Sequence, residues 1–256
     1  MIIGKYGIWI SVVFLLLNCD KERFFEGPDQ YIDDFESYEL VDELFFGDNE
    51  KWSFTQQTFE GNSLSVSREK FHSGTQSIKF SALNPSDSDS ASKASIVKQK
   101  MAFWEGETVS ADFWIYLEGN EESNWLFLFD LEEQATIGAG PGIRLALVEN
   151  ALLIEHKYPN PNIEQKGEKL RFPRDEWVNI QLEIKLSRKK EGYIKVWQNE
   201  NLIIDQSKWK TLPKDILYFQ QGTKGMYSSV EFGITANTLD NPTVLYVDDV
   251  EVKVLE

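Results

Sequence analysis

Residues 178–186, VNIQLEIKL, alternate apolar and polar side chains without a break. Strict alternation is typical of a β-strand with one face in the core and the other in solvent, because successive side chains point to opposite faces. A charged, turn-like segment at 187–192 leads to a second run, Tyr193–Trp197, and residues 198–201 lead to a third, Leu202–Ile204. This stretch predicts three consecutive antiparallel strands.

Short runs rich in β-branched and aromatic residues continue along the chain, separated by Gly, Asn, Asp, Pro and Ser. They predict further strands at 77–82, 109–117, 125–131, 143–148, 152–157, 230–235 and 244–255. No stretch after Asp33 has a helical period. So many strands without helices predict an all-β fold, a two-sheet antiparallel β-sandwich.

The N-terminal residues have the outline of a signal peptide. One positive charge, Lys5, precedes an apolar run over 8–17, which is about half the roughly 20 residues that a membrane-spanning helix needs. The segment Leu16–Cys19 resembles the bacterial lipobox, with Asn18 where Gly, Ala or Ser is usual. The resemblance implies cleavage before Cys19 and lipid on its sulfur. A plain secretory signal with an incidental cysteine is the alternative.

These features predict a signal peptide at 1–18, a lipidated cysteine and flexible tether at 19–31, and a β-sandwich domain at 32–256. Asp20-Lys21-Glu22 resembles the surface-export signals of Bacteroidota lipoproteins. We therefore expect a location at the outer membrane or cell surface, outside the cytoplasm and anchored by lipid.

The charge balance constrains the partners. The chain has 26 Lys and Arg against 42 Asp and Glu, a formal net charge of −16, so nucleic acid is excluded as a partner on electrostatic grounds. Cys19 is the one cysteine. If its sulfur carries lipid, the mature domain folds without disulfides.

Several segments resemble known carbohydrate-binding families. Asp34–Ser37, Phe71–Phe80 and Leu245–Val252 look like carbohydrate-binding-module jelly rolls, in which the first and last strands lie side by side. Phe172–Asn179 and Gly192–Asn199 are similar to concanavalin A-like domains, which include laminin-G-type lectins and heparin-lyase-like polysaccharide lyases. Both resemblances imply a jelly-roll sandwich.

The jelly-roll resemblance also implies a structural Ca²⁺. A hard cation needs several oxygen ligands, and carboxylates near the two ends of the domain can supply them. Our candidates are Glu36 and Asp248, with Asp34 and backbone carbonyls around Ser73 as lesser ones. The alternative is that these are ordinary turn and edge-strand charges.

Aromatic residues on one strand predict a glycan-binding surface. Tyr193, Lys195 and Trp197 project from one face of their strand, while the two aliphatic residues between them project from the other and suit the core better. Rings open to solvent can stack on sugars while amides and acids bond the hydroxyls. Trp114, on another predicted strand, is the fourth candidate.

Three functions follow as hypotheses. We favour a membrane-anchored polysaccharide-binding lipoprotein that is not an enzyme, because such sandwiches resemble accessory proteins of polysaccharide utilisation that capture glycans beside an outer-membrane transporter. A second hypothesis is a polysaccharide lyase acting on a uronic-acid-containing glycan. A third is a non-catalytic structural or assembly subunit that binds another protein.

The lyase hypothesis names its own candidates. Lyases of this sandwich type commonly use a tyrosine, sometimes with a histidine, to remove the proton beside a uronic carboxylate while Arg, Asn or Gln neutralises that carboxylate. Arg144, His156 and Tyr193, together with Lys157, can supply such a set if the fold brings them together.

Overall fold

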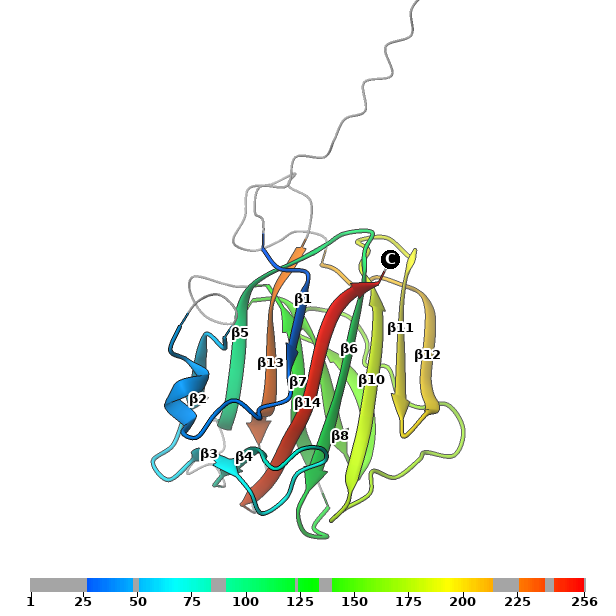
Figure 1. The fold of residues 1–256 in the computed structure, drawn as a ribbon. Helices are drawn as coiled ribbons and strands as arrows, with labels where there is room; N and C mark the ends of the chain where they lie inside the picture. Colours follow the sequence, from blue (N-terminus) through cyan, green and yellow to red (C-terminus); the bar gives the residue numbers. More distant parts are fainter. Residues whose placement is uncertain are drawn as a thin grey trace, which may run out of the picture.

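The computed structural model describes residues 27–47, 51–83, 91–122, 124–133, 140–213, 226–237 and 242–255. In these residues, fourteen β-strands form two antiparallel sheets, with one short 3-10 helix, η1 (Val41–Leu44) (Figure 1). The predicted all-β, two-sheet sandwich is confirmed. None of the described residues forms a helix long and apolar enough to cross a bilayer.

The eight-stranded sheet has the order β12-β11-β10-β6-β14-β4-β3, with β1 also paired to β14. Its strands are β1 (Gln30–Asp33), β3 (Ser63–Ser67), β4 (Ser77–Ala82), β6 (Thr108–Leu117), β10 (Trp177–Lys185), β11 (Gly192–Gln198), β12 (Asn201–Trp209) and β14 (Thr243–Leu255). The three consecutive antiparallel strands predicted from 178 onward are therefore confirmed as β10, β11 and β12. The first and last strands do lie side by side, with Gln30 opposite Lys253.

The six-stranded sheet has the order β2-β5-β13-β7-β8-β9. Its strands are β2 (Phe54–Gln57), β5 (Ser92–Trp104), β7 (Asn124–Glu132), β8 (Gly142–Val148), β9 (Ala151–His156) and β13 (Met226–Asn237). Four of them, β13-β7-β8-β9, are adjacent in that order. This order matters for the site because it lines up residues that are far apart in sequence.

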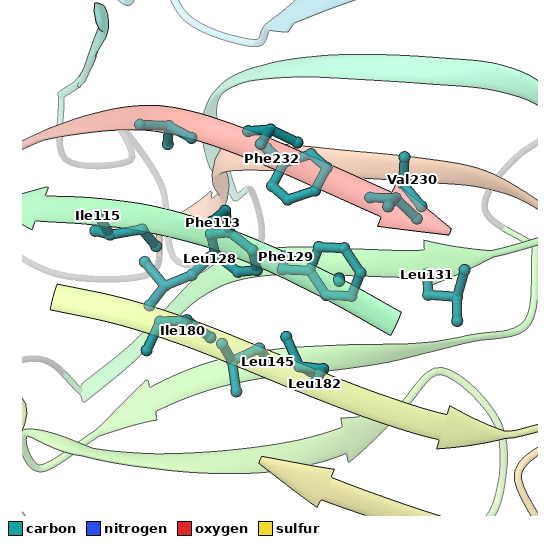
Figure 2. Close-up of a cluster of buried hydrophobic side chains, with 14 of the residues drawn as sticks. Phe113, Ile115, Leu128, Phe129, Leu131, Leu145, Ile180, Leu182, Val230 and Phe232 are labelled. Carbon is teal, nitrogen blue, oxygen red and sulfur yellow. The ribbon is translucent and has the colours of Figure 1, made fainter. Parts of the chain in front are cut away.

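The core lies between the sheets and is built from the inward-facing residue of each alternating pair (Figure 2). Phe232 on β13 packs against Phe113 on β6 and Phe129 on β7, with ring centroids 5.0 Å apart in each pair. Truncation of any of these rings to alanine is expected to cost about 3–5 kcal/mol.

Several features differ from the sequence-based prediction. Sheet pairing begins at Gln30, inside the segment predicted as tether. The short strands β2 and β3 were not predicted. The 13-residue strand β5 was not predicted either, because its sequence does not alternate cleanly. Lys98, for example, is buried on β5, where its ammonium lies 4.5 Å from the ring centroid of Tyr31 and donates a hydrogen bond to the carbonyl oxygen of Lys51.

Candidate active site

Ionisable side chains gather on the outer face of the six-stranded sheet. On β7, β8 and β9, one residue of each alternating pair enters the core and the other points outward. With ionisable side chains from β5 and β13 they form what we call the charged face. It consists of Lys93 on β5, Asp130 and Glu132 on β7, Arg144 on β8, Glu155 on β9, Lys157 directly after β9, and Glu231 on β13.

Four members of the charged face form one row across four strands. Glu231 on β13 stands opposite Asp130 on β7, Asp130 opposite Arg144 on β8, and Arg144 opposite Glu155 on β9. Arg144 bridges its two neighbours, with Nε 3.3 Å from Asp130 Oδ2 and Nη1 3.5 Å from Glu155 Oε1. The sheet order therefore places an arginine between carboxylates.

A lysine completes the network one step further along the strands. The ammonium of Lys157 lies 3.6 Å from Asp130 Oδ2 and also pairs with Glu132. Gly142 on β8 lies opposite Glu132, and a Cβ there would meet Glu132 Cβ at 2.6 Å. The absence of a side chain at Gly142 therefore leaves room for the side chain of Glu132.

The charged face has two layers. The side chains of Asp130 and Glu231 are 0% and 1% exposed, whereas those of Arg144 and Glu155 are 18% and 22% exposed. Thr235 and Ser95 also donate to the buried acids, at 3.0 Å to Asp130 and 2.5 Å to Glu231. The acids therefore form a fixed floor that orients the cationic groups nearer the surface.

Burial shifts the protonation of this face. Burial, reinforced by the charge of Asp130, raises the pKa of Glu231 to about 7 although Lys93 lies 3.8 Å away. Burial also raises the pKa values of Glu132 and Glu155, against the opposing effects of Lys157 and Arg144 respectively. Burial therefore makes these three carboxylates stronger bases than exposed ones.

Of the predicted catalytic residues, only Arg144 and Lys157 lie on the charged face. His156 lies opposite Ile143, and its Nε2 accepts a 3.1 Å hydrogen bond from Trp209 Nε1. Burial lowers the pKa of His156 to about 4. Tyr193 belongs to the other sheet. The structure thus does not bring His156 and Tyr193 to Arg144.

The carboxylates of the charged face were missed from the sequence. Their signal is a charged residue inside an otherwise apolar strand, as in LFLFDLE for Asp130 and SVEFGI for Glu231. Alternation alone predicts that such a residue points outward, but it does not predict which side chains lie beside it. The residue is therefore taken for an ordinary solvated charge.

The predicted glycan-binding residues lie on the outer face of the eight-stranded sheet. Ile194 and Val196 are fully buried, so Tyr193, Lys195 and Trp197 project outward as expected. Trp114 also projects outward, but His72 stacks on its ring at 3.6 Å between centroids. One ring face of Trp114 is therefore covered by protein.

Two of the predicted calcium ligands, Glu36 and Asp248, hold the same loop. Glu36 accepts hydrogen bonds from Thr75 and from the backbone N–H of Gln76, while Asp248 accepts them from the backbone N–H groups of His72 and Ser73. The three segments quoted for the jelly-roll resemblance thus do meet.

Those hydrogen bonds occupy oxygens that a cation would need. Asp34 accepts from the backbone N–H of Glu36, and the hydroxyl of Ser73 donates to Asp249. Among the described residues, no three His, Cys, Asp or Glu side chains are grouped to hold a metal. Calcium binding stays a prediction, which a fall in melting temperature on chelation would support.

A cavity of about 430 Å³ lies elsewhere, at one end of the sandwich. The turn at 105–106, residues 185–189 and Glu191 line it, and Arg188 pairs with Glu105 there, with Nη2 2.8 Å from Oε2. This pair and the charged face are on different elements. Cys19, the predicted lipidation site, lies outside the described residues.

The family model described as polysaccharide lyase matches residues 45–251. The chain therefore belongs to the polysaccharide lyase family. No curated protein matches it in sequence.

Solved structures with the same fold include lyases. The chain is similar to the endo-β-1,4-glucuronan lyase from the fungus Trichoderma reesei, at 14% identity and a TM-score of 0.62 over 80% of this chain and 91% of that one. It is also similar to the alginate lyase Aly36B, at 10% identity and a TM-score of 0.57 over 90% and 100%.

A third similar structure is the cellulose-induced protein Cip1, at 16% identity and a TM-score of 0.59 over 86% of this chain and 95% of that one. At such identities these likenesses show the fold alone. The family match favours the lyase hypothesis over the binding lipoprotein that we favoured from the sequence.

Proposed function

We propose that this polysaccharide lyase cleaves a uronic-acid-containing glycan by β-elimination on the charged face. The observation that carries the proposal is the cross-strand row in which Arg144 lies between Asp130 and Glu155, beside Lys157. Similar lyases acting on glucuronan and alginate support a uronate substrate class.

The proposed chemistry assigns one role each to Arg144, Glu155 and Lys157. Arg144 binds and neutralises the uronate carboxylate, which acidifies the proton on C5. Glu155 accepts that proton, and its raised pKa makes it a stronger base. The C5–H electrons form the C4–C5 double bond as the C4–O bond breaks, and Lys157 protonates the departing oxygen. Glu155 then returns its proton to Lys157.

The buried acids have a positioning role in this proposal. Asp130 contacts the charged groups of Arg144 and Lys157, at 3.3 Å and 3.6 Å, and is itself fixed by Thr235. Because its side chain is fully buried, Asp130 orients the two cations without touching the glycan.

Membrane anchoring through lipid on Cys19 is part of the same proposal and rests on the lipobox resemblance of residues 16–19. A lyase held outside the cytoplasm by such a tether acts on glycans too large to enter the cell. The surface location and a neighbouring transporter follow only from that resemblance.

The test is to incubate the purified protein with alginate, polygalacturonate and glucuronan and to measure new unsaturated ends by near-ultraviolet absorbance. We expect elimination of at least one polymer, with losses of about 10²–10³-fold in Arg144→Ala and about 10²–10⁴-fold in Glu155→Gln.

Matched controls are available on the surface. Arg171 is 73% exposed and lies 3.8 Å from Glu122, and Glu164 pairs with Lys169. Arg171→Ala and Glu164→Gln should keep full activity. No unsaturated ends from any polymer, or full activity in Arg144→Ala, would overturn the proposal.

A further inference from the structure

The outer face of β10, β11 and β12 presents a platform that the proposed elimination does not use. Tyr193, Lys195 and Trp197 stand in line on β11 because Ile194 and Val196 fill the core. The two rings are four residues apart, which corresponds to about 13 Å along a strand. All three outward side chains are half-buried.

Lys195 joins the two rings. Its ammonium lies 5.3 Å from the centroid of Tyr193 and 5.9 Å from that of Trp197. Contact with both rings restrains the lysine chain between them. The three side chains therefore form one continuous strip along β11.

Both neighbouring strands extend the strip. On β12, Leu202 stands opposite Trp197 and is 47% exposed, a large apolar side chain left open beside an indole. On β10, Gln181 stands on the other side of Trp197. Its amide donates to Asp112 at 2.9 Å, which orients the amide group. Apolar and hydrogen-bonding groups thus meet at one place.

Charge decides which glycan suits this strip. Glu183 on β10 and Asp205 on β12 flank Lys195 in register. Two carboxylates around one ammonium disfavour a polyanion, and the chain as a whole carries −16. Rings, amides and carboxylates together suit a neutral, hydroxyl-rich ligand.

We infer that the Tyr193–Trp197 strip, with Leu202 and Gln181, is a non-catalytic binding site for a neutral polysaccharide. It lies on the sheet opposite the charged face, so both surfaces can be occupied at once (Figure 1). Attachment to neutral chains raises the effective concentration of a uronate substrate that occurs in the same material.

The test measures depletion of the purified protein from solution by insoluble cellulose, xylan and mannan. We expect retention by at least one polymer that persists in high salt, because the ligand carries no charge. Tyr193→Ala and Trp197→Ala should each weaken retention by about tenfold. Phe46→Ala, which removes a ring that is 71% exposed, is the matched control and should bind normally.

A second variant, Leu202→Asp, tests the same site if an aromatic variant folds poorly. Leu202 is exposed, so the substitution should be tolerated, and the new charge would face the sugar. We expect it to weaken retention without lowering the melting temperature. Absence of retention by all three polymers would overturn the inference. Unchanged binding in Leu202→Asp and in both single aromatic variants would overturn it as well.

Elimination is measured separately from this binding. Arg144→Ala should be retained by the neutral polymer as well as the unaltered protein is. Elimination without retention refutes the binding site alone, and retention without elimination refutes the proposed lyase reaction alone.

Discussion

Arg144 shows how a single residue acquires a role from its neighbours. In isolation, an arginine on a strand is a solvated charge. Between Asp130 and Glu155 it is held at two points, and a guanidinium fixed in this way is organised to receive a carboxylate. The cost is the burial of acids, which is tolerable only because cations and hydroxyl donors lie beside them.

For Glu231, the free-energy cost of burying an acid can be measured. Its pKa rises from 4.5 in a free side chain to about 7, so the folded state holds a proton that the unfolded state releases over this range. This stabilisation is complete below pH 4.5 and is lost as the pH rises through about 7. The loss amounts to at most about 3 kcal/mol.

We therefore predict that Glu231→Gln becomes more stable relative to the unaltered protein as the pH increases from 4.5 to 8. The measurement is urea unfolding at a series of pH values, with Glu191→Gln, the loss of an exposed carboxylate, as the baseline. A stability difference between Glu231→Gln and the unaltered protein that does not change with pH would contradict the assignment.

At the scale of elements, the short strand β1 depends on one buried carboxylate. Asp33, at its end, accepts hydrogen bonds from Tyr38 Oη and Trp52 Nε1, both at 2.8 Å, and from Phe35 N at 2.9 Å. Four residues of strand pairing are weak alone. The carboxylate ties β1 to the segment that follows it and to the core.

Asp33→Ala should lower the free energy of unfolding by about 3 kcal/mol, because it leaves the buried donors of Tyr38 and Trp52 without an acceptor. Denaturant unfolding checks the value. Asp29→Ala, at an exposed position just before β1, should change stability by less than about 0.5 kcal/mol. Equal effects of the two substitutions would show that the network contributes little.

At the scale of the whole molecule, the two proposed glycan-binding surfaces lie on different sheets. The six-stranded sheet carries the charged face, the eight-stranded sheet carries the aromatic strip, and β1 and the C-terminal end of β14 lie at one end of the sandwich (Figure 1). The two surfaces are therefore on different sheets, and neither includes β1.

Lipid at Cys19 predicts the behaviour of the intact chain. Protein expressed in a bacterium with its own leader should enter the detergent phase on phase separation, and Cys19→Ala should move to the aqueous phase. Elimination activity should be the same in both forms, since Cys19 is not among the residues of the proposed reaction. An unaltered protein found in the aqueous phase would refute lipidation.

The sequence by itself determined the all-β fold, most strands and the direction of their side chains. Alternation in residues 178–186 predicts β10, and the aliphatic pair Ile194 and Val196 correctly assigns Tyr193 and Trp197 to the outer face. These features are local, because a strand's two faces follow from the geometry of its own backbone. The strand β5 escaped prediction since buried polar residues such as Lys98 interrupt its pattern.

Only the tertiary structure decided which charged side chains meet. Glu231, Asp130, Arg144 and Glu155 form a row because β13, β7, β8 and β9 are adjacent in that order and register. Strand order depends on long-range pairing, which leaves no periodic trace in the sequence. For the same reason, His156 and Tyr193 were reasonable candidates in the chain, although the fold places neither of them beside Arg144.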